Sequence, residues 1–351
     1  MSGISLIKED EWDQILNGFP KDGSDIYFSP EYSLLNSPLE DGAPKCIKFE
    51  NSEGIAIYPY LERNIPLVLT DGKEMKDVTT PYGYGGPIST IYSLSFVESF
   101  NKALDEYFLD MRYVSEFIRF HPVLENHKLR SCEVIYVHDT YGVDFGAKDF
   151  TKSLAFWKDS LKRGVKKAEK LNLRFEMNIL DERELDDFIK IYTRTMERKK
   201  ALSFYFFNDQ YWDLLLELSK RNMVFIASVF FEEKKIASAI FLSWNGFYLH
   251  YHLGGSKSEY LNMRPVNYLF WNVEKWAATN NFHLLHFGGG VERGDGLERF
   301  KSSISNKAFK FYVGRKLFRA EIYSKLNANA NSLSKEKFNK NFFPAYRSIF
   351  R

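Results

Sequence analysis

The sequence predicts an α/β protein built from two copies of one unit, and three observations support this fold class. First, a length of 351 residues suits about two domains of ~150 residues each. Second, an apolar strand over 248–253, a helix over 265–280 and an apolar strand over 283–287 follow one another, and each strand ends in glycines. Third, the first half repeats this order of elements. A strand, a crossover helix and a strand imply parallel pairing, with ligands at the carboxyl ends of the strands.

The duplication concerns the order of elements and not the identity of residues. The corresponding segments are 54–62, 78–87, 94–109 and 115–120 in the first half and 235–244, 248–256, 265–280 and 283–287 in the second. We therefore expect mixed sheets of α+β type in two domains, 1–150 and 151–326. Strands 308–313 and 316–322 are predicted to form a hairpin around Gly314-Arg315. The polar tail 327–351 ends in FFPAYRSIFR, whose aromatic residues suggest that it docks back on the body.

Composition narrows the class of protein. Apolar residues make up 44% and charged residues 27%, which is ordinary for a globular protein, and the net charge of +2 argues against wholesale coating of nucleic acid. Cys46 and Cys132 are far apart and lack metal-ligand spacing, so neither a disulfide framework nor a zinc site is expected. No stretch approaches the ~18 apolar residues of a membrane-spanning helix, and we expect a cytoplasmic protein without a membrane span.

A basic helix is predicted between the two copies, over 150–173. Its cations fall at i, i+4 steps, which places them on one side of the helix. They are Lys158, Lys162, Lys166 and Lys170, with Arg163 and Lys167 beside them. Such a stripe can bind phosphates of a nucleic acid or a nucleotide, with Lys162, Lys166 and Lys167 as the candidate contacts, or it can be a solvated helix face.

The candidate catalytic residues surround the second glycine cluster, Gly288, Gly289 and Gly290. Lys301 follows this turn and can point its ammonium at a carbonyl oxygen that develops negative charge, although a lone lysine can also be a surface residue. Asp295 and Glu292 can accept a proton from a nucleophilic amine, or they can serve the turn. Tyr251 can offer its hydroxyl to substrate, or it can pack across the strands.

Other residues are candidates for substrate contacts. Tyr82 and Tyr84 lie in the loop VTTPYGYGGP, which either stacks on a sugar or base or forms a rigid turn. Asn267 at the start of helix 265–280 and Arg198 near the end of a helix predicted over 182–200 complete this set. His250, His252, His283 and His286 have no spacing that makes three of them converge and no carboxylate at ligand spacing, so no metal is expected.

Several motifs, in order, resemble the FemABX-like aminoacyltransferases, which have a twin GNAT fold. They are VTTPYGYGGP, the run KRGVKKAEKLN, YHLGGS followed by RPVNYLFWNVEKWA, and HFGGG followed by LERFK. The resemblance covers residues 20 to 325. It implies tandem GNAT-like domains, with the acyl-transfer site in the second domain. We expect the first domain to shape the acceptor groove. It also implies that Phe300 and Lys301 match a Phe-Lys pair that stabilises the transition state, and that Tyr251 lies near the family's strand tyrosine.

The resemblance further implies transfer of an acyl or aminoacyl group to an amine of a cell-envelope precursor. The acceptor is then a peptidoglycan peptide or a surface-polysaccharide nucleotide sugar, linked to a nucleotide or a lipid, and no cofactor is permanently bound. The donor is aminoacyl-tRNA or acyl-CoA; the stretch KSEYLNMRPVN lacks the glycines of the usual acyl-CoA loop, and the long helical hairpin of some family members is absent. The alternative hypotheses are a non-catalytic binding module for an anionic glycan or nucleotide and, more weakly, an RNA-binding protein.

Overall fold

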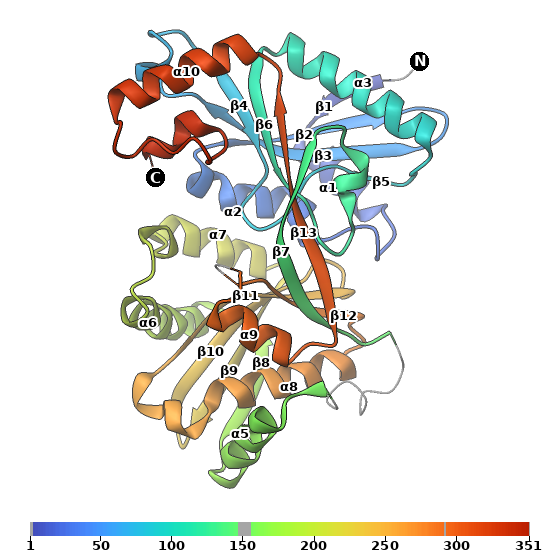
Figure 1. Cartoon of the computed structure of the whole chain (residues 1–351). Coiled ribbons are helices and arrows are strands. Elements are labelled where there is room, and N and C mark those ends of the chain that lie inside the picture. The colour runs from blue at the N-terminus through green and yellow to red at the C-terminus, as the bar shows by residue number, and fades with distance from the viewer. Residues whose placement is uncertain (1–2, 147–155, 291–292, 351) are drawn as a thin grey trace. The chain divides into compact units, whose positions relative to one another are not determined.

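Each half of the chain folds its strand, helix and strand into a β-α-β arrangement with parallel strands. The computed structural model describes residues 3–146, 156–290 and 293–350. The chain divides into two compact units, one formed by Met1–Val137 with Phe311–Arg351 and the other by His138–Lys310 (Figure 1). We call them unit 1 and unit 2. None of the described helices is long and apolar enough to cross a membrane.

Unit 2 contains the predicted elements of the second half. They are β8 (Arg174–Ile179), α6 (Glu182–Arg198), α7 (Asp209–Ser219), β9 (Val224–Phe231), β10 (Lys234–Leu242), β11 (Tyr248–Ser256), α8 (Pro265–Thr279) and β12 (Leu284–Gly288). Its strands follow the order β8-β9-β10-β11-β12, and all neighbours are antiparallel except β11 and β12, which are parallel. The parallel pairing predicted from the glycine-ended strands is therefore confirmed.

Unit 1 has the same succession of elements. They are β1 (Gly3–Ile7), α1 (Glu9–Asn17), α2 (Pro30–Glu40), β2 (Ala43–Glu50), β3 (Ile55–Asn64), β4 (Lys76–Thr79), α3 (Leu94–Asp110) and β6 (Tyr113–Arg119). The strand order is β1-β2-β3-β4-β6, and again only the pair around the helix, β4 and β6, is parallel; the short β5 (Ile88–Ser89) pairs with β3. The α/β class and the duplicated order of elements predicted from the sequence are confirmed.

Two long strands were not predicted correctly. β7 (Glu133–Asp144) was missed, and β13 (Lys307–Leu317) is one strand where the sequence suggested a hairpin around Gly314-Arg315. The end of β7 pairs with β12 in unit 2, whereas the end of β13 pairs with β6 in unit 1. Each unit thus receives its last strand from a segment that begins in the other, which also explains why the unit boundaries fall inside β7 and β13 and not at residue 150.

The tail also differs from its prediction. β13 ends at Leu317 and α10 (Ala320–Leu333) follows, so the predicted second strand over 316–322 does not form and residues 327–333 of the polar tail are helical. Residues 327–351 belong to unit 1 and do not form a separate segment. Only Leu326 and Ala330 of this helix are buried, and asparagine and serine residues interrupt its apolar positions, so its apolar pattern is too sparse to predict it from the sequence.

One face of the unit 2 sheet is covered by α8 and by α5 (Asp159–Lys170). Their apolar residues, among them Val165, Phe270 and Val273, share one core cluster with the strand residues Val229 and Phe241. Figure 1 shows α6 and α7 apart from this helix pair. Both begin at side-chain caps, since Asp181 accepts from the amide of Glu184 and Asn208 from that of Tyr211, as expected for these residue types at a helix start. The predicted helix start at 150–155 lies outside the described residues.

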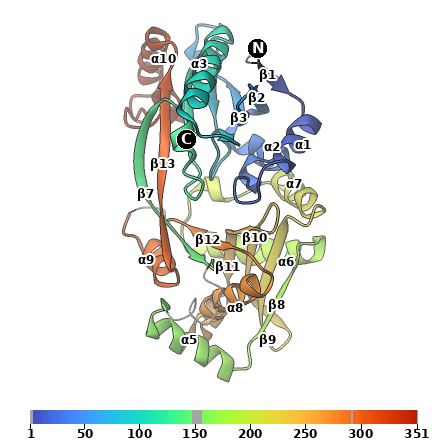
Figure 2. The ribbon, with the colours of Figure 1, turned by 90° about the vertical axis from the view of Figure 1, so that its right-hand side faces the viewer.

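In unit 1 the long helix α3 packs its aromatic face on the sheet (Figure 2). Phe96, Phe100 and Phe108 are fully buried against strand residues such as Phe49 and Tyr60. The spacing of these phenylalanines along the helix follows the helical period, which is why this amphipathic helix could be predicted from the sequence.

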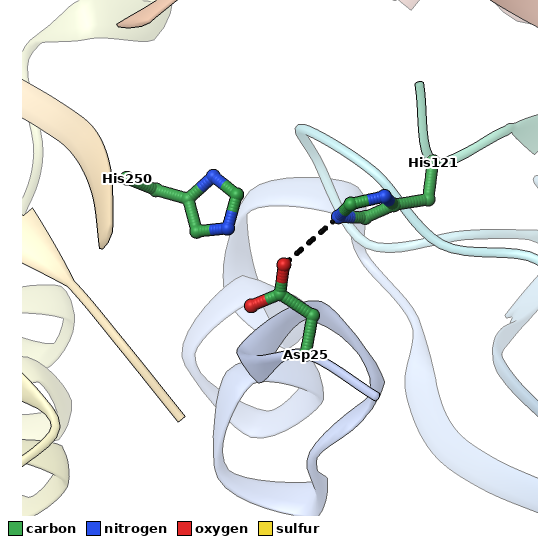
Figure 3. Close-up of side chains that lie close together, drawn as sticks. All are labelled: Asp25, His121 and His250. Atoms are coloured by element: carbon green, nitrogen blue, oxygen red, sulfur yellow. Dashed lines mark hydrogen bonds and ion pairs between the residues drawn. The ribbon is translucent and has the colours of Figure 1, made fainter. Parts of the chain in front are cut away.

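A buried histidine joins the N-terminal segment of unit 1 to the end of β6. The amide of Leu124 donates to Nδ1 of His121 (3.2 Å), so this nitrogen is an acceptor and Nε2 carries the proton. That proton is donated to Asp25 at 3.0 Å (Figure 3), while the other oxygen of Asp25 accepts from the amide of Ile26 at 2.7 Å. Both side chains are fully buried, and this pairing satisfies polar groups that would otherwise be costly to bury.

The aromatic C-terminal segment packs back onto unit 1 around Asp77. This carboxylate on β4 is fully buried and accepts from Arg63 (2.8 Å), from the hydroxyl of Tyr346 (2.7 Å) and from Arg347 (2.6 and 3.0 Å). Burial alone would raise the pKa of Asp77, but the two guanidinium groups outweigh it and lower that pKa. The C-terminal segment is therefore held by charge-assisted hydrogen bonds as well as by its aromatic rings.

Replacing Asp77 by Ala should destabilise unit 1 strongly. The change leaves Arg63 and Arg347 as buried cations without their shared counter-ion, and such a change typically costs about 3–5 kcal/mol of unfolding free energy. Denaturant unfolding measures this effect. Lys325→Ala is the control, because the ion pair of Lys325 with Asp71 is exposed and should contribute little to stability. Equal destabilisation of both variants would contradict the role given to Asp77.

Candidate acyl-transfer site

The two parallel strands of unit 2 pair over a short distance only. β11 and β12 match at Tyr248 with Leu284, Leu249 with Leu285 and His250 with His286, and the ladder between them ends there. Beyond this point β11 continues beside β10, with an irregular register between Ile240 and Phe241, while β12 shifts its register against β7 before Gly288. The carboxyl ends of the two strands thus do not pair with each other, and the candidate catalytic residues lie around these two ends.

The turn after β12 requires its glycines. Gly288 has a φ of 73°, in the region that L-residues with side chains rarely adopt. A Cβ atom on Gly289 would lie 2.3 Å from a ring carbon of His138, and one on Gly290 would lie 2.6 Å from Oδ1 of Asp295. The turn thus packs closely against β7 at Gly289 and against the start of α9 at Gly290.

The short helix α9 (Gly296–Ser303) carries Lys301 into the protein interior. The helix begins at Asp295, whose carboxylate accepts from the amide of Glu298 at 2.6 Å. Lys301 is only 7% exposed, and its Nζ donates to the carbonyl oxygen of Gly289 at 2.7 Å. The same nitrogen lies 5.5 Å from the ring centre of Tyr251, within the range of a cation–π contact. The structure therefore brings the three predicted catalytic residues together, with Asp295 positioning the helix.

Burial changes the protonation of this lysine. Loss of hydration lowers the pKa of Lys301 from 10.5 to about 7; the carboxylate of Asp295 acts against this shift, and the positive charge of Lys199 adds to it. An amine with such a pKa exists in both protonation states near neutral pH. It can donate from an ammonium group to a developing oxyanion, and it can also exchange a proton with a reacting group.

Tyr251 stands on β11 among aromatic rings. Its ring lies 5.7 Å from that of Phe241 and 5.2 Å from that of Phe270, and Phe300 packs on Phe270 at 5.7 Å. Burial raises the pKa of Tyr251 to about 12, so its hydroxyl keeps its proton at neutral pH and can serve as a donor. A Cβ on Gly254 would come within 2.6 Å of this hydroxyl, so the first glycine cluster makes room for the phenol.

The other predicted contacts in unit 2 lie on different elements. The side chain of Asn267, in the first turn of α8, packs against Gly164 of α5, where a Cβ would come within 2.7 Å of its amide nitrogen. Arg198, at the end of α6, donates to the carbonyl of Ser256 at 2.9 Å. Lys166 and Lys167 are exposed on α5, whereas Lys162 is half-buried and lies 4.0 Å from Asp159. Glu292 lies outside the described residues.

The two tyrosines of the VTTPYGYGGP loop belong to unit 1. Tyr84 is 9% exposed and packs edge-on against Tyr27 and His121, at ring distances of 4.9 and 5.5 Å. Tyr82 is 36% exposed, with the guanidinium of Arg119 5.8 Å from its ring. Tyr84 is thus built into the aromatic packing of unit 1, while Tyr82 presents part of its ring to solvent.

A buried histidine pair on the two parallel strands was not foreseen. His250 and His286 meet through their Nδ1 atoms at 3.2 Å, and Nε2 of His286 lies 2.9 Å from the hydroxyl of Thr140, which donates to the carbonyl of Phe309. His252 turns to the other side and bonds Tyr211 at 2.5 Å. Both His250 and His286 lie two residues after the start of their strands, so the predicted parallel register could have paired them.

This geometry suits acyl transfer. A backbone turn, a buried amine and a protonated phenol converge at the ends of two parallel strands, and all three can act on a carbonyl group. The amine supplies a positive charge in a dry environment, where electrostatic stabilisation of an oxyanion is strongest.

Comparison with known proteins identifies the class. Residues 157–302 match the sequence model of the family described as acetyltransferase (GNAT) domain. This segment contains β11, α8, β12 and Lys301, so the site described above lies inside the GNAT domain, and the protein is an acyltransferase. A comparison with curated protein sequences finds no match.

Solved structures give a more particular likeness for the whole chain. The crystal structure of FemX is similar with a TM-score of 0.68 at 13% identity, over 92% of this chain and 99% of FemX. The C-terminal domain of a putative lysylphosphatidylglycerol synthetase from Agrobacterium fabrum follows with a TM-score of 0.56 at 12% identity, over 93% and 98% of the two chains. L-PGS from Bacillus licheniformis has a TM-score of 0.52 at 14% identity, over 86% and 96%. The fold of the whole chain is thus that of FemX, in agreement with the FemABX-like resemblance.

Lys301→Met should stabilise the protein, and more so at low pH. The pKa of Lys301 is about 7 in the folded chain and has its ordinary value of 10.5 in the unfolded chain. Between these two pH values the unfolded chain therefore keeps a proton on Lys301 that the folded chain has released. Wild-type stability therefore rises with pH across this window, whereas the methionine variant lacks this dependence. Thermal unfolding at pH ~6 and ~10 measures it. A gain in melting temperature that is larger at the higher pH would contradict the assignment.

Proposed function

We propose that this protein transfers an aminoacyl group to an amine of a cell-envelope precursor by direct attack, with Lys301 stabilising the transition state. The observation that carries the proposal is the buried ammonium of Lys301 at the glycine turn after β12, inside the GNAT domain. The acyltransferase class favours this function over a non-catalytic binding module.

In the proposed reaction the acceptor nitrogen attacks the ester carbonyl carbon of the donor. The new C–N bond forms while the carbonyl electrons move to oxygen, and the ammonium of Lys301 neutralises this oxyanion. Collapse of the intermediate breaks the C–O bond, and the leaving hydroxyl takes up the proton lost by the amine. The protonated hydroxyl of Tyr251 and the backbone at Gly288, Gly289 and Gly290 orient the carbonyl. No covalent intermediate with the protein is required.

Aminoacyl-tRNA is the donor that we favour over acyl-CoA. Acyl-CoA enzymes of the GNAT type usually hold the pyrophosphate with a glycine-rich loop before the central helix. Here the residues before α8 form a short 3-10 helix, Ser258–Met263, and α8 begins with Pro265, which has no amide proton to donate. In addition, α5 packs against the first turn of α8 through Gly164 and Asn267. These features leave that turn poorly equipped to cradle a pyrophosphate.

The basic face of α5 supplies an alternative place for phosphates. Arg163, Lys166, Lys167 and Lys170 are all exposed on this helix. A row of cations at helical spacing fits the phosphate backbone of a nucleic acid, whose binding releases counter-ions and weakens with salt. This face is therefore our proposed contact for the tRNA part of the donor, with Lys162 at its edge.

The acceptor proposal rests on the shared fold and on the sequence motifs. FemX, the domain of a putative lysylphosphatidylglycerol synthetase and L-PGS share the fold. The motifs resemble those of FemABX-like proteins, which add amino acids to cell-wall peptides. We propose an envelope precursor carried on a nucleotide or a lipid, with unit 1 shaping the acceptor groove and Tyr82 as one contact. Mass spectrometry of envelope precursors from cells that lack the protein would identify the aminoacyl group and the acceptor together.

Lys301→Met should lower kcat/KM by at least about 30-fold, or ~2 kcal/mol of transition-state stabilisation, as expected when an oxyanion donor is removed. Steady-state turnover of aminoacyl-tRNA with the acceptor measures this effect. Lys307→Met is the matched control, because Lys307 is half-exposed in the same unit and pairs with Asp144 at 2.6 Å. We expect a change of less than about two-fold for it. Full activity of a folded Lys301→Met variant would refute the proposed role.

Reversing charges on α5 should weaken binding of the donor and leave the chemistry intact. In the double variant Lys166→Glu and Lys167→Glu, KM for aminoacyl-tRNA should rise about ten-fold. The slope of log Kd against the logarithm of the salt concentration should decrease by ~0.7–0.9 for each phosphate that the protein no longer neutralises. Filter binding at several salt concentrations measures this slope. Lys335→Glu with Lys337→Glu, two exposed lysines of unit 1, is the control. An unchanged slope would show that tRNA binds to a face of the protein other than α5.

A further inference from the structure

The connection between α6 and α7 exposes large apolar side chains. Leu202 is 71% exposed and Phe206 is 43% exposed, in the segment ALSFYFF that joins the two helices. Leucine and phenylalanine are among the residues that are most often buried in folded proteins. We call residues 199–207 the apolar loop.

Contacts of its inward-facing aromatic residues fix the conformation of the apolar loop, and this also fixes the arrangement of its exposed side chains. Phe207 stacks on Tyr211 of α7 at a ring distance of 4.0 Å and an angle of 14°. The hydroxyl of Tyr192 on α6 donates to the carbonyl of Tyr205 at 2.9 Å. These contacts anchor the aromatic residues that face inward, while Leu202 and Phe206 face solvent.

Exposed cations lie close in sequence to the apolar side chains. Arg194, Arg198, Lys199 and Lys200 are exposed at or just before the loop, against the two exposed acids Glu197 and Asp209. Lys200 has a φ of 51°, a left-handed conformation in which glycine or asparagine would be favoured.

The loop borders the acyl-transfer site. The positive charge of Lys199 acts on the amine of Lys301, and Arg198 bonds the carbonyl of Ser256 at the end of β11. A surface that binds the apolar loop is thus brought next to the reacting groups of unit 2.

Another exposed leucine makes the contrast clear. Leu94 at the start of α3 is 74% exposed, but its neighbours Ser93 and Ser95 both donate to the carboxylate of Glu53. An acid borders that site, whereas four cations and two acids lie in or beside the apolar loop. A single exposed leucine is common on protein surfaces. Exposed leucine and phenylalanine side chains near cations, in contrast, are suited to bind a partner surface that is both apolar and negatively charged.

We propose that the apolar loop is a membrane-contact site, inserting Leu202 and Phe206 into the interface of an anionic bilayer while Lys199 and Lys200 contact lipid phosphates. The inference rests on the proposed function, because a lipid-linked acceptor has its reactive headgroup at such a surface. Attachment is reversible, since two side chains and a few cations provide far less than a membrane-spanning helix.

Sedimentation of the full chain with vesicles tests the proposal. Vesicles of phosphatidylcholine with about 30 mol% phosphatidylglycerol should bind the protein at ~50 mM NaCl, and binding should fall at ~500 mM NaCl because the cations are screened. Leu202→Ser with Phe206→Ser should weaken binding at least about ten-fold. Lys200→Gly should weaken it about five-fold, as expected for one cation at an anionic surface, while raising the melting temperature by relieving backbone strain.

Leu94→Ser is the control and should change vesicle binding by less than about two-fold. Equal binding by the double serine variant, equal binding to pure phosphatidylcholine, or no binding by the wild type would overturn the proposal. A dimer in light scattering that the double variant does not form would also overturn it, by assigning the loop to a second copy of the chain. Turnover of a water-soluble nucleotide-linked acceptor separates this inference from the proposed function: the double variant should keep it, whereas Lys301→Met should lose it.

Discussion

The contact on which the site depends is the hydrogen bond from the buried ammonium of Lys301 to the carbonyl of Gly289. Removing an amine from water is costly, and one carbonyl with a nearby carboxylate compensates it only in part, as the lowered pKa of Lys301 shows. The glycines of the turn, the cap at Asp295 and the ring of Tyr251 are what keep the amine in this position. A buried amine held at a cost to stability in a GNAT domain agrees with the role in the reaction that we propose for Lys301.

Much of the acyl-transfer site could be predicted because its determinants are local. Glycines that end two apolar strands, with Pro265 opening the helix between them, were sufficient to predict the parallel pair and the place of Lys301 after the second turn. The burial of Lys301 could not be predicted, because it depends on rings from β11 and α8 that the sequence does not place beside α9. The same holds for the charge effect of Lys199, which comes from the end of α6.

The wrong predictions of two strands also have physical explanations. Gly314 suggested a turn, yet it lies inside β13 because a Cβ there would come within 2.7 Å of the ring of Phe120, so the residue serves a close approach. β7 has exposed or half-exposed side chains over most of its length and lacks the apolar alternation by which strands are recognised. Both strands are also the ones exchanged between the two units, so their partners lie far away in the sequence.

Membrane contact and catalysis would reinforce each other through the charge on Lys301. With a pKa of about 7, roughly half of this amine is protonated at neutral pH in the free protein, although the proposed role requires the ammonium form. An anionic membrane surface at about −30 mV attracts protons and raises the pKa of nearby amines by ~0.5. Docking of the apolar loop would therefore increase the fraction of protein with a charged Lys301 at the place where a lipid-linked acceptor is found. The cation Lys199 opposes protonation of Lys301 in the free protein, and lipid phosphates bound to Lys199 would weaken that opposition.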